Sequence, residues 1–313
     1  MSKFSPGGLG SAIKFVKNFR SLNSGEIIQE VSRPFGLQIN GSPENRDNLV
    51  QRLSIEAPGR EPSTHVAAFP PISAGIDVPD GAIVERAKTP VITLDADEVA
   101  GDEARLALVL AQIVVDNPEI RLAISSRLPA FRPAVVAGLI NEASWMNARI
   151  AVLSALPAII PFTEILLPAA ALGDMVILTR NQAVLLLRIA AAYGLPVHLK
   201  DRTKELLPVV GTAFGWRAVA RELIGMVPGG IGIVVKGAVA FAGTYTVGRA
   251  ASIYYSTGYS LKPPRLKKLY QDAYRSAISQ VRQMVKGERN RKAKNLVNEE
   301  RPTVELEQPS ASE

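Results

Sequence analysis

The sequence has no cysteine and only two histidines, His65 and His198, in 313 residues. The lack of cysteine excludes disulfide bonds, a thiolate nucleophile, and zinc or iron–sulfur sites with cysteine ligands. Two histidines nearly exclude a histidine-rich metal site and a Ser-His-Asp hydrolase. No active site is visible in the sequence, and we predict no catalytic residues, no metal and no cofactor.

Aromatic residues are also scarce, at 6%, so the 47% of hydrophobic residues are mostly aliphatic. Acidic residues are outnumbered, with 29 Asp and Glu against 36 Lys and Arg, which gives a net charge of +7. A basic chain rich in aliphatic residues is typical of helices at an anionic membrane surface.

Residues 1–24 are predicted to form a basic amphipathic arm. Apolar residues recur there at helical spacing, and Lys14, Lys17 and Arg20 fall mostly on the other side. The arm lacks the apolar core and cleavage site of a secretory signal. We expect it either to attach to a membrane surface or to dock on the protein itself.

Residues 261–297 predict a basic amphipathic helix, and 298–313 a disordered tail. Between Tyr259 and Lys294 many Lys and Arg face only Asp272 and Glu288 as acids. The basic side has three interpretations: a solvated face of a helix packed on the protein, a lipid-binding face, or a nucleic-acid-binding face. No nucleic-acid motif favours the third. The residues expected at a membrane or partner surface are Lys14, Lys17, Arg20, Arg265, Lys267, Lys268, Arg275 and Arg282.

Residues 25–156 predict an α/β domain, because candidate strands and helices alternate, and alternation is typical of a mostly parallel sheet covered on both faces. The expected strands are 35–40, 89–95, 120–125 and 147–153, and the expected helices are 45–53, 102–115 and 133–143.

The order of these elements resembles a Ras-like GTPase domain of the septation or Era type over residues 33–156. The segment Gly41-Ser-Pro-Glu-Asn-Arg-Asp-Asn48 stands where that family has its GxxxxGK[ST] phosphate-binding loop. Gly41 is kept, but Arg46, Asp47 and Asn48 replace the second glycine, the lysine and the Ser/Thr. An aspartate in place of the lysine would repel a nucleotide.

Two further segments bear on this resemblance. Ser126-Arg-Leu-Pro129 stands at the guanine-reading motif and has no aspartate, whereas Ser154-Ala155 matches the family's SA pair. The resemblance implies a degenerate P-loop GTPase domain without nucleotide. An unrelated small α/β domain is the alternative.

Carboxylates follow the expected strand 89–95. Asp95, Asp97 and Glu98 stand at the end of a parallel strand, where ligands of α/β proteins bind, and oxygen ligands suit Mg²⁺. The favoured alternative is a loop whose aspartates cap the backbone before the next helix.

Residues 157–260 predict a domain of apolar helices. The segments 150–179 and 223–248 reach the roughly 20 residues that span a bilayer, but prolines interrupt both. Buried or interfacial helices are the alternative to spanning ones. Gly237 and Gly248 share a helix face, so we expect tight packing there, with Val235 pointing outward.

Several ordered motifs of this region resemble the bacterial GTPase-associated domain of unknown function, family 697, of YcjF-type membrane proteins. The resemblance implies a helical, membrane-associated module without known catalysis. The matching segments are Ile160–Glu164, Gln182, Arg188–Gly194, Glu205–Leu207, Ile224–Pro228, Lys236, Thr246–Ala250 and Tyr254–Gly258.

These observations predict a non-enzymatic, membrane-associated interaction or scaffold protein with a pseudo-GTPase domain. The expected location is the cytoplasmic face of the cell membrane, peripheral or integral, with a cytoplasmic protein as the alternative. The expected partners are an anionic membrane surface, a GTPase or other protein, and a second copy of the chain. The alternative functions are an active GTP-binding hydrolase with an atypical loop and a membrane-inserting, pore-like helical protein.

Overall fold

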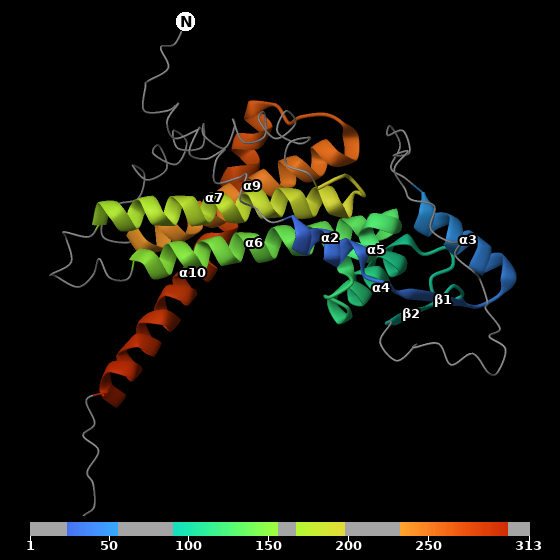
Figure 1. Cartoon of the computed structure of the whole chain (residues 1–313), viewed down its shortest axis with the longest axis horizontal. Helices are drawn as coiled ribbons and strands as arrows, with labels where there is room; N and C mark the ends of the chain where they lie inside the picture. The colour runs from blue at the N-terminus through green and yellow to red at the C-terminus, as the bar shows by residue number, and fades with distance from the viewer. Residues whose placement is uncertain (1–23, 56–89, 156–166, 198–231, 300–313) are drawn as a thin grey trace, which may run out of the picture.

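The structure is a computed structural model that describes residues 24–55, 90–155, 167–197 and 232–299 (Figure 1). Within these ranges the chain is mostly helical, with eight α-helices and one parallel sheet of two strands. The predicted combination of α/β and α structure is confirmed at this level. A P-loop fold is not confirmed.

The sheet pairs β1 (Gly36–Asn40) with β2 (Val91–Asp95), so that Asn40 lies opposite Asp95. One face is buried through Ile39, Ile92 and Leu94, and the other face is exposed. Both strands were predicted, because each is an apolar run bounded by turn residues.

A helix follows each strand, as predicted. α3 (Pro43–Ser54) follows β1 and buries Leu49 and Leu53. α4 (Glu103–Asp116) follows β2. The side chain of Asp102 accepts a hydrogen bond of 2.8 Å from the backbone N–H of Arg105, so α4 begins at an N-cap that the sequence encodes.

The predicted strands 120–125 and 147–153 are wrong. The first is α5 (Arg121–Arg127), and the second lies inside α6 (Arg132–Ala155), which follows the short 3-10 helix η2 (Pro129–Phe131). The run 120–125 is largely buried, so it has no period that separates a strand from a helix; in 147–153 the exposed residues Arg149 and Leu153 are four positions apart, on one side of the helix. No glycine or proline interrupts 139–156, so α6 continues through the expected turn.

The second half is a helical bundle. α9 (Gly232–Thr257) packs against α6, α7 (Leu167–Ala192) and α10 (Pro263–Glu299). Figure 1 shows α6 and α7 side by side, while the C-terminal part of α10 extends away from the other helices. The short α2 (Gly25–Ser32) packs against α5 and α7.

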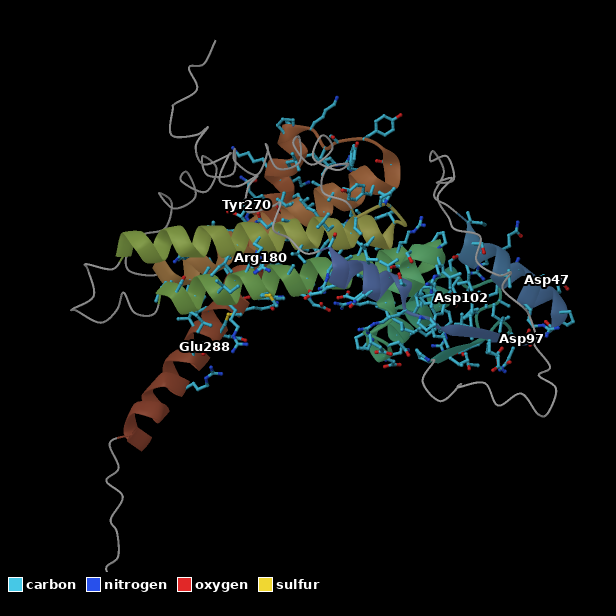
Figure 2. All side chains as sticks on the ribbon, viewed as in Figure 1. Asp47, Asp97, Asp102, Arg180, Tyr270 and Glu288 are labelled. Carbon is cyan, nitrogen blue, oxygen red and sulfur yellow. The ribbon has the colours of Figure 1, made fainter. Side chains whose placement is uncertain are left out.

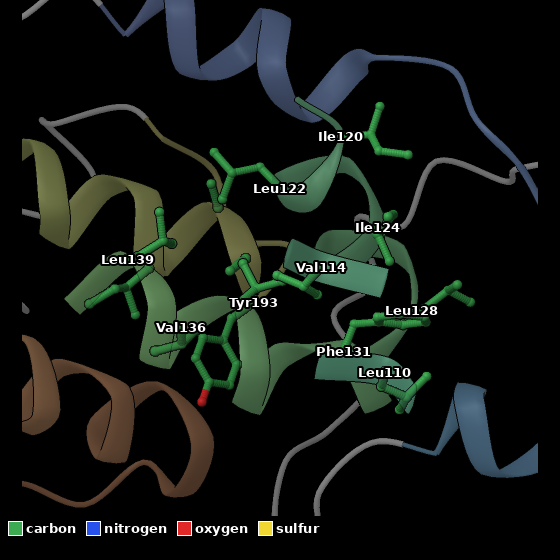
Figure 3. Packing of buried hydrophobic residues seen from close by; sticks show 14 of the residues in the cluster. Leu110, Val114, Ile120, Leu122, Ile124, Leu128, Phe131, Val136, Leu139 and Tyr193 are labelled. Atoms are coloured by element: carbon green, nitrogen blue, oxygen red, sulfur yellow. The ribbon is translucent and has the colours of Figure 1, made fainter. Parts of the chain in front are cut away.

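Two hydrophobic clusters hold the described parts together. The first joins the sheet, α4, α5, the N-terminal half of α6 and the ends of α7 and α9, and Figure 3 shows Leu110, Leu128 and Phe131 within it. The second joins the C-terminal half of α6 to α9 and α10. α6 therefore belongs to both clusters, whereas the predicted domain boundary at 156/157 lies outside the described residues.

None of the described helices combines the length and the apolar character that a membrane span requires. Of the two predicted spans, 156–166 and 223–231 lie outside the described residues. The rest of the second span, residues 232–248, forms the N-terminal part of α9. Gly237 and Gly248 are buried there, as expected. Val235 is also buried, at 6% exposure, so the expectation that it points outward is wrong.

Candidate functional site

The predicted nucleotide loop is a very short connection. β1 ends at Asn40 and α3 begins at Pro43, so only Gly41 and Ser42 join them. Gly41 has a φ of 115°, a conformation that favours glycine. A Cβ atom at this position would also come within 3.1 Å of the carboxyl carbon of Asp97.

The carboxylate of Asp97 caps the start of α3. It accepts hydrogen bonds from the backbone N–H of Ser42 at 3.0 and 3.1 Å, from the Ser42 hydroxyl at 2.8 Å and from the Asn45 side-chain amide at 2.8 Å. These bonds, with that from Asn45 as the largest cause, lower the pKa of Asp97. Asp97 therefore places a negative charge at the N-terminus of α3, where a phosphate-binding protein would hold its ligand.

The other residues of the predicted loop do not join this cluster as a phosphate cradle. Arg46, Asp47 and Asn48 lie within α3, with Asp47 and Asn48 exposed. Figure 2 shows Asp47 and Asp97 at the same end of the molecule. The structure thus brings Gly41 to Asp97, a contact between residues 56 positions apart in the sequence that the motif comparison did not reveal.

The neighbouring carboxylates Asp95 and Glu98 also have partners within the protein. Asp95 accepts a bond of 2.9 Å from the backbone N–H of Asp97, and Glu98 forms an ion pair with Arg105. In the part of the chain that the structure describes, no three His, Asp or Glu side chains are placed to hold a metal ion. Both aspartates thus bind backbone N–H groups, as the capping interpretation expected, but Asp97 caps the preceding helix α3, whereas the next helix, α4, is capped by Asp102.

The second candidate site is the outer face of α10. The opposite, inner side of α10 carries an apolar stripe, which is buried and includes Leu266, Tyr270, Ala277, Val281 and Val285. Burial raises the pKa of Tyr270 and of Tyr274 on the same side of the helix. The interpretation in which this helix packs its apolar side on the protein is therefore confirmed.

The predicted basic residues of α10 are all exposed. Lys268, Arg275 and Arg282 stand seven residues apart, so they form one row along the side of the helix opposite the buried stripe. The exposed basic side chains of the described part of α10 are Arg265, Lys267, Lys268, Arg275, Arg282, Lys286 and Arg291. The predicted surface residues Lys14, Lys17 and Arg20 lie outside the described residues.

The two acids of α10 predicted to offset this charge have different surroundings. Glu288 is 12% exposed and pairs with Arg149 of α6 at 3.2 Å and with Arg291 at 3.5 Å. Asp272 is exposed. The outer face of α10 therefore carries a large excess of positive charge. Figure 2 shows that Glu288 of α10 lies far from Asp97, so the two candidate sites are well separated.

Sequence reasoning missed a buried polar network where α6, α7 and α9 meet. The side-chain amide of Asn147 donates to the hydroxyl of Thr244 at 2.8 Å, and its oxygen accepts from Asn181 at 2.8 Å. Gln182 also donates to Thr244, at 3.2 Å. Asn147 and Thr244 are fully buried. The one available signal was the presence of amide and hydroxyl side chains in otherwise apolar helices.

Residues of the GTPase-associated resemblance have structural roles at the ends of α7 and α9. Arg188 of α7 forms an ion pair of 2.7 Å with Glu30 of α2. The ring of Tyr193 lies 5.4 Å from the guanidinium of Arg132. Gly194 and Gly258 follow the two helices with φ of 69° and 75°, as glycine C-caps do.

Comparison with family models, with curated proteins and with solved structures found no match for this chain. The resemblances to a GTPase domain and to the GTPase-associated domain stay predictions. The functional argument rests on the capped start of α3 and on the basic face of α10.

Proposed function

We propose that the protein is a non-enzymatic interaction protein that attaches to anionic membrane surfaces through the basic face of α10. The observation that carries this proposal is the separation of the two faces of the helix. Its apolar stripe is buried against α9 and α6, while Lys268, Arg275 and Arg282 are exposed on the opposite side.

This separation determines the mode of attachment. An amphipathic helix that inserts into lipid does so with its apolar face. In α10 that face is occupied by the protein, so binding depends on charge. Each Lys or Arg near an anionic surface contributes about 1 kcal/mol, and salt screens the attraction over a Debye length of about 8 Å. Lys268, Arg275 and Arg282 can approach one flat surface together because they form one row.

The start of α3 supports the non-enzymatic part of the proposal. A phosphate-binding loop surrounds its ligand with backbone N–H groups, and here the two-residue connection and the carboxylate of Asp97 take that position. The resemblance to the GTPase-associated domain adds a protein partner to the proposal, with a GTPase as the first candidate.

Flotation of the full chain with lipid vesicles tests the proposal. We expect binding to vesicles with anionic lipid, weak binding to neutral vesicles, and release at high salt. The variant Arg275→Glu with Arg282→Glu should bind anionic vesicles at least tenfold more weakly, since two attractive charges become repulsive.

The matched control is Arg46→Glu with Arg180→Glu, which changes the net charge equally but lies on α3 and α7. It should keep most of the binding. Equal loss in both variants would show that net charge alone controls attachment. Salt-resistant binding to neutral vesicles would show apolar insertion. Either result contradicts the proposal.

A further inference from the structure

α4 is apolar on two opposite sides. Its inner side buries Leu106, Leu110 and Val114 in the first hydrophobic cluster. On its outer side Leu108 is 66% exposed and Val115 is 70% exposed. Among the large apolar side chains of the described residues, only Tyr259, at 79%, is more exposed than Val115. A helix that is apolar all round normally has a partner on each side.

The outer apolar residues form a continuous seam. Ala104, Leu108, Ala111 and Val115 follow one another at steps of four, three and four residues, the spacing of the contact positions in paired helices. Ala104, Leu108 and Val115 are exposed, and Ala111 is half-buried. The alternation of small and large side chains leaves room for a second helix to approach closely.

We propose that a second copy of this chain covers the seam, with the two α4 helices antiparallel about a twofold axis. Two copies of one surface can close a dimer only if that surface complements itself. With the axis between Leu108 and Ala111, Leu108 lies on the partner's Ala111 and Ala104 lies on the partner's Val115. Each large side chain then packs against a small one.

Charge complementarity selects the antiparallel arrangement. Arg105 and Asp116 lie on the same flank of the seam, near opposite ends of α4, and both are exposed; Arg105 also pairs with Glu98 of its own chain, and its guanidinium has further N–H groups for a second carboxylate. The twofold axis brings Arg105 to the partner's Asp116, and the contact occurs twice. The side-chain amide of Gln112 donates a hydrogen bond of 2.9 Å to the carboxylate of Asp116 and so orients it. A parallel twofold pair would instead place Arg105 and the partner's Asp116 near opposite ends of the seam, so this contact would not form.

The size of the seam predicts the strength of association. Standard interfaces bury roughly 1,600 Å², and four side chains on one helix supply less. The dimer should therefore depend on concentration, and it should dissociate on dilution. This surface is separate from α10, so dimer formation and vesicle binding can be measured independently.

Sedimentation of the full chain over a range of concentrations tests the proposal. We expect wild-type protein to shift from monomer to dimer, and Leu108→Lys to stay monomeric, since it buries a charge in the seam. The matched control is Met146→Lys on α6, where the side chain is 58% exposed. It should dimerise like the wild type.

Three results overturn the proposal: a wild type that is monomeric throughout, a dimer that survives in Leu108→Lys, or equal loss in Met146→Lys. A monomeric wild type whose melting temperature falls in Leu108→Lys would show instead that another part of the same chain covers the seam.

Disulfide cross-linking tests the arrangement, because the chain has no cysteine of its own. Mixed Ala104→Cys and Val115→Cys proteins should form a disulfide between unlike chains. Ala104→Cys alone should not, because its two copies would be eleven residues apart along the helix, about 16 Å, and a disulfide needs Cα atoms within about 7 Å. Cross-linking of Ala104→Cys with itself would overturn the antiparallel dimer.

Discussion

Gly237 of α9 lies against Val281 of α10, so closely that a Cβ atom at Gly237 would come 2.7 Å from Cγ1 of Val281. The same atom would come 2.8 Å from Cγ2 of Val152 on α6. Three helices therefore meet at one glycine. The contact places the apolar stripe of α10 on the bundle, and it thereby determines which side of α10 carries the exposed charges.

Gly237→Leu should lower the free energy of unfolding by roughly 1–3 kcal/mol, because the added side chain overpacks the contact with Val281 and Val152. Gly248→Leu should act similarly, since a Cβ atom there would come 2.7 Å from Ile140. Thermal and urea unfolding measure the change.

The control for these variants is Gly243→Ala on the same helix. A Cβ atom at Gly243 meets nothing within 4 Å, so this variant should unfold at the wild-type midpoint or slightly above it, since alanine favours a helix. Leucine variants that melt with the wild type would mean that α9 is not packed as the structure has it.

Asn147→Ala should destabilise the bundle by about 1–3 kcal/mol, because it removes the hydrogen bonds that the buried Asn147 makes to Thr244 and to the half-buried Asn181. The double variant Asn147→Leu with Thr244→Val removes both partners, and it should cost less than the sum of the single variants Asn147→Leu and Thr244→Val. Urea unfolding of the four proteins gives the coupling energy. Strict additivity would contradict a connected network.

Asp97→Asn should lower the melting temperature at neutral pH, because the charged carboxylate caps α3. The pKa of Asp97 is lower in the folded protein than in the unfolded chain. Its ionisation therefore stabilises the fold above the unfolded pKa of about 3.9, and this contribution is lost as pH falls through the lower, folded value. The difference between variant and wild type should shrink below about pH 4.

Melting curves from pH 7 to pH 3 measure this effect. Asp47→Asn, an exposed change in the same helix, controls for the loss of one negative charge. A difference between Asp97→Asn and the wild type that stays constant across the range would contradict the proposed role of the charge.

Wild-type protein should give no binding heat with GTP and Mg²⁺ in a calorimetric titration at physiological nucleotide concentration. The carboxylate of Asp97 and the exposed Asp47 repel the phosphates, and the connection between β1 and α3 has no room to surround them. Micromolar binding that is lost in Arg46→Ala would favour the alternative of an active hydrolase.

Local signals in the sequence predicted the first elements well. The apolar runs that became β1 and β2, and the periodic segments 45–53 and 102–115 that became α3 and α4, each depend on residues within a few positions of one another. The same kind of local signal gave wrong strand predictions at 120–125 and 147–153, which are helical. A buried apolar run fits a strand or a helix equally, and only the surrounding contacts decide between them.

The sequence by itself determined the excess of basic charge, the heptad row from Lys268 to Arg282 and the absence of thiol chemistry, because these follow from residue identity and helical period. The tertiary structure decided which side of α10 is buried, since Gly237 and Val281 come together only when the bundle forms. It also brought Asp97 to the start of α3 and Asn147 to Thr244. These contacts join residues far apart in the chain, and no local pattern encodes their distance.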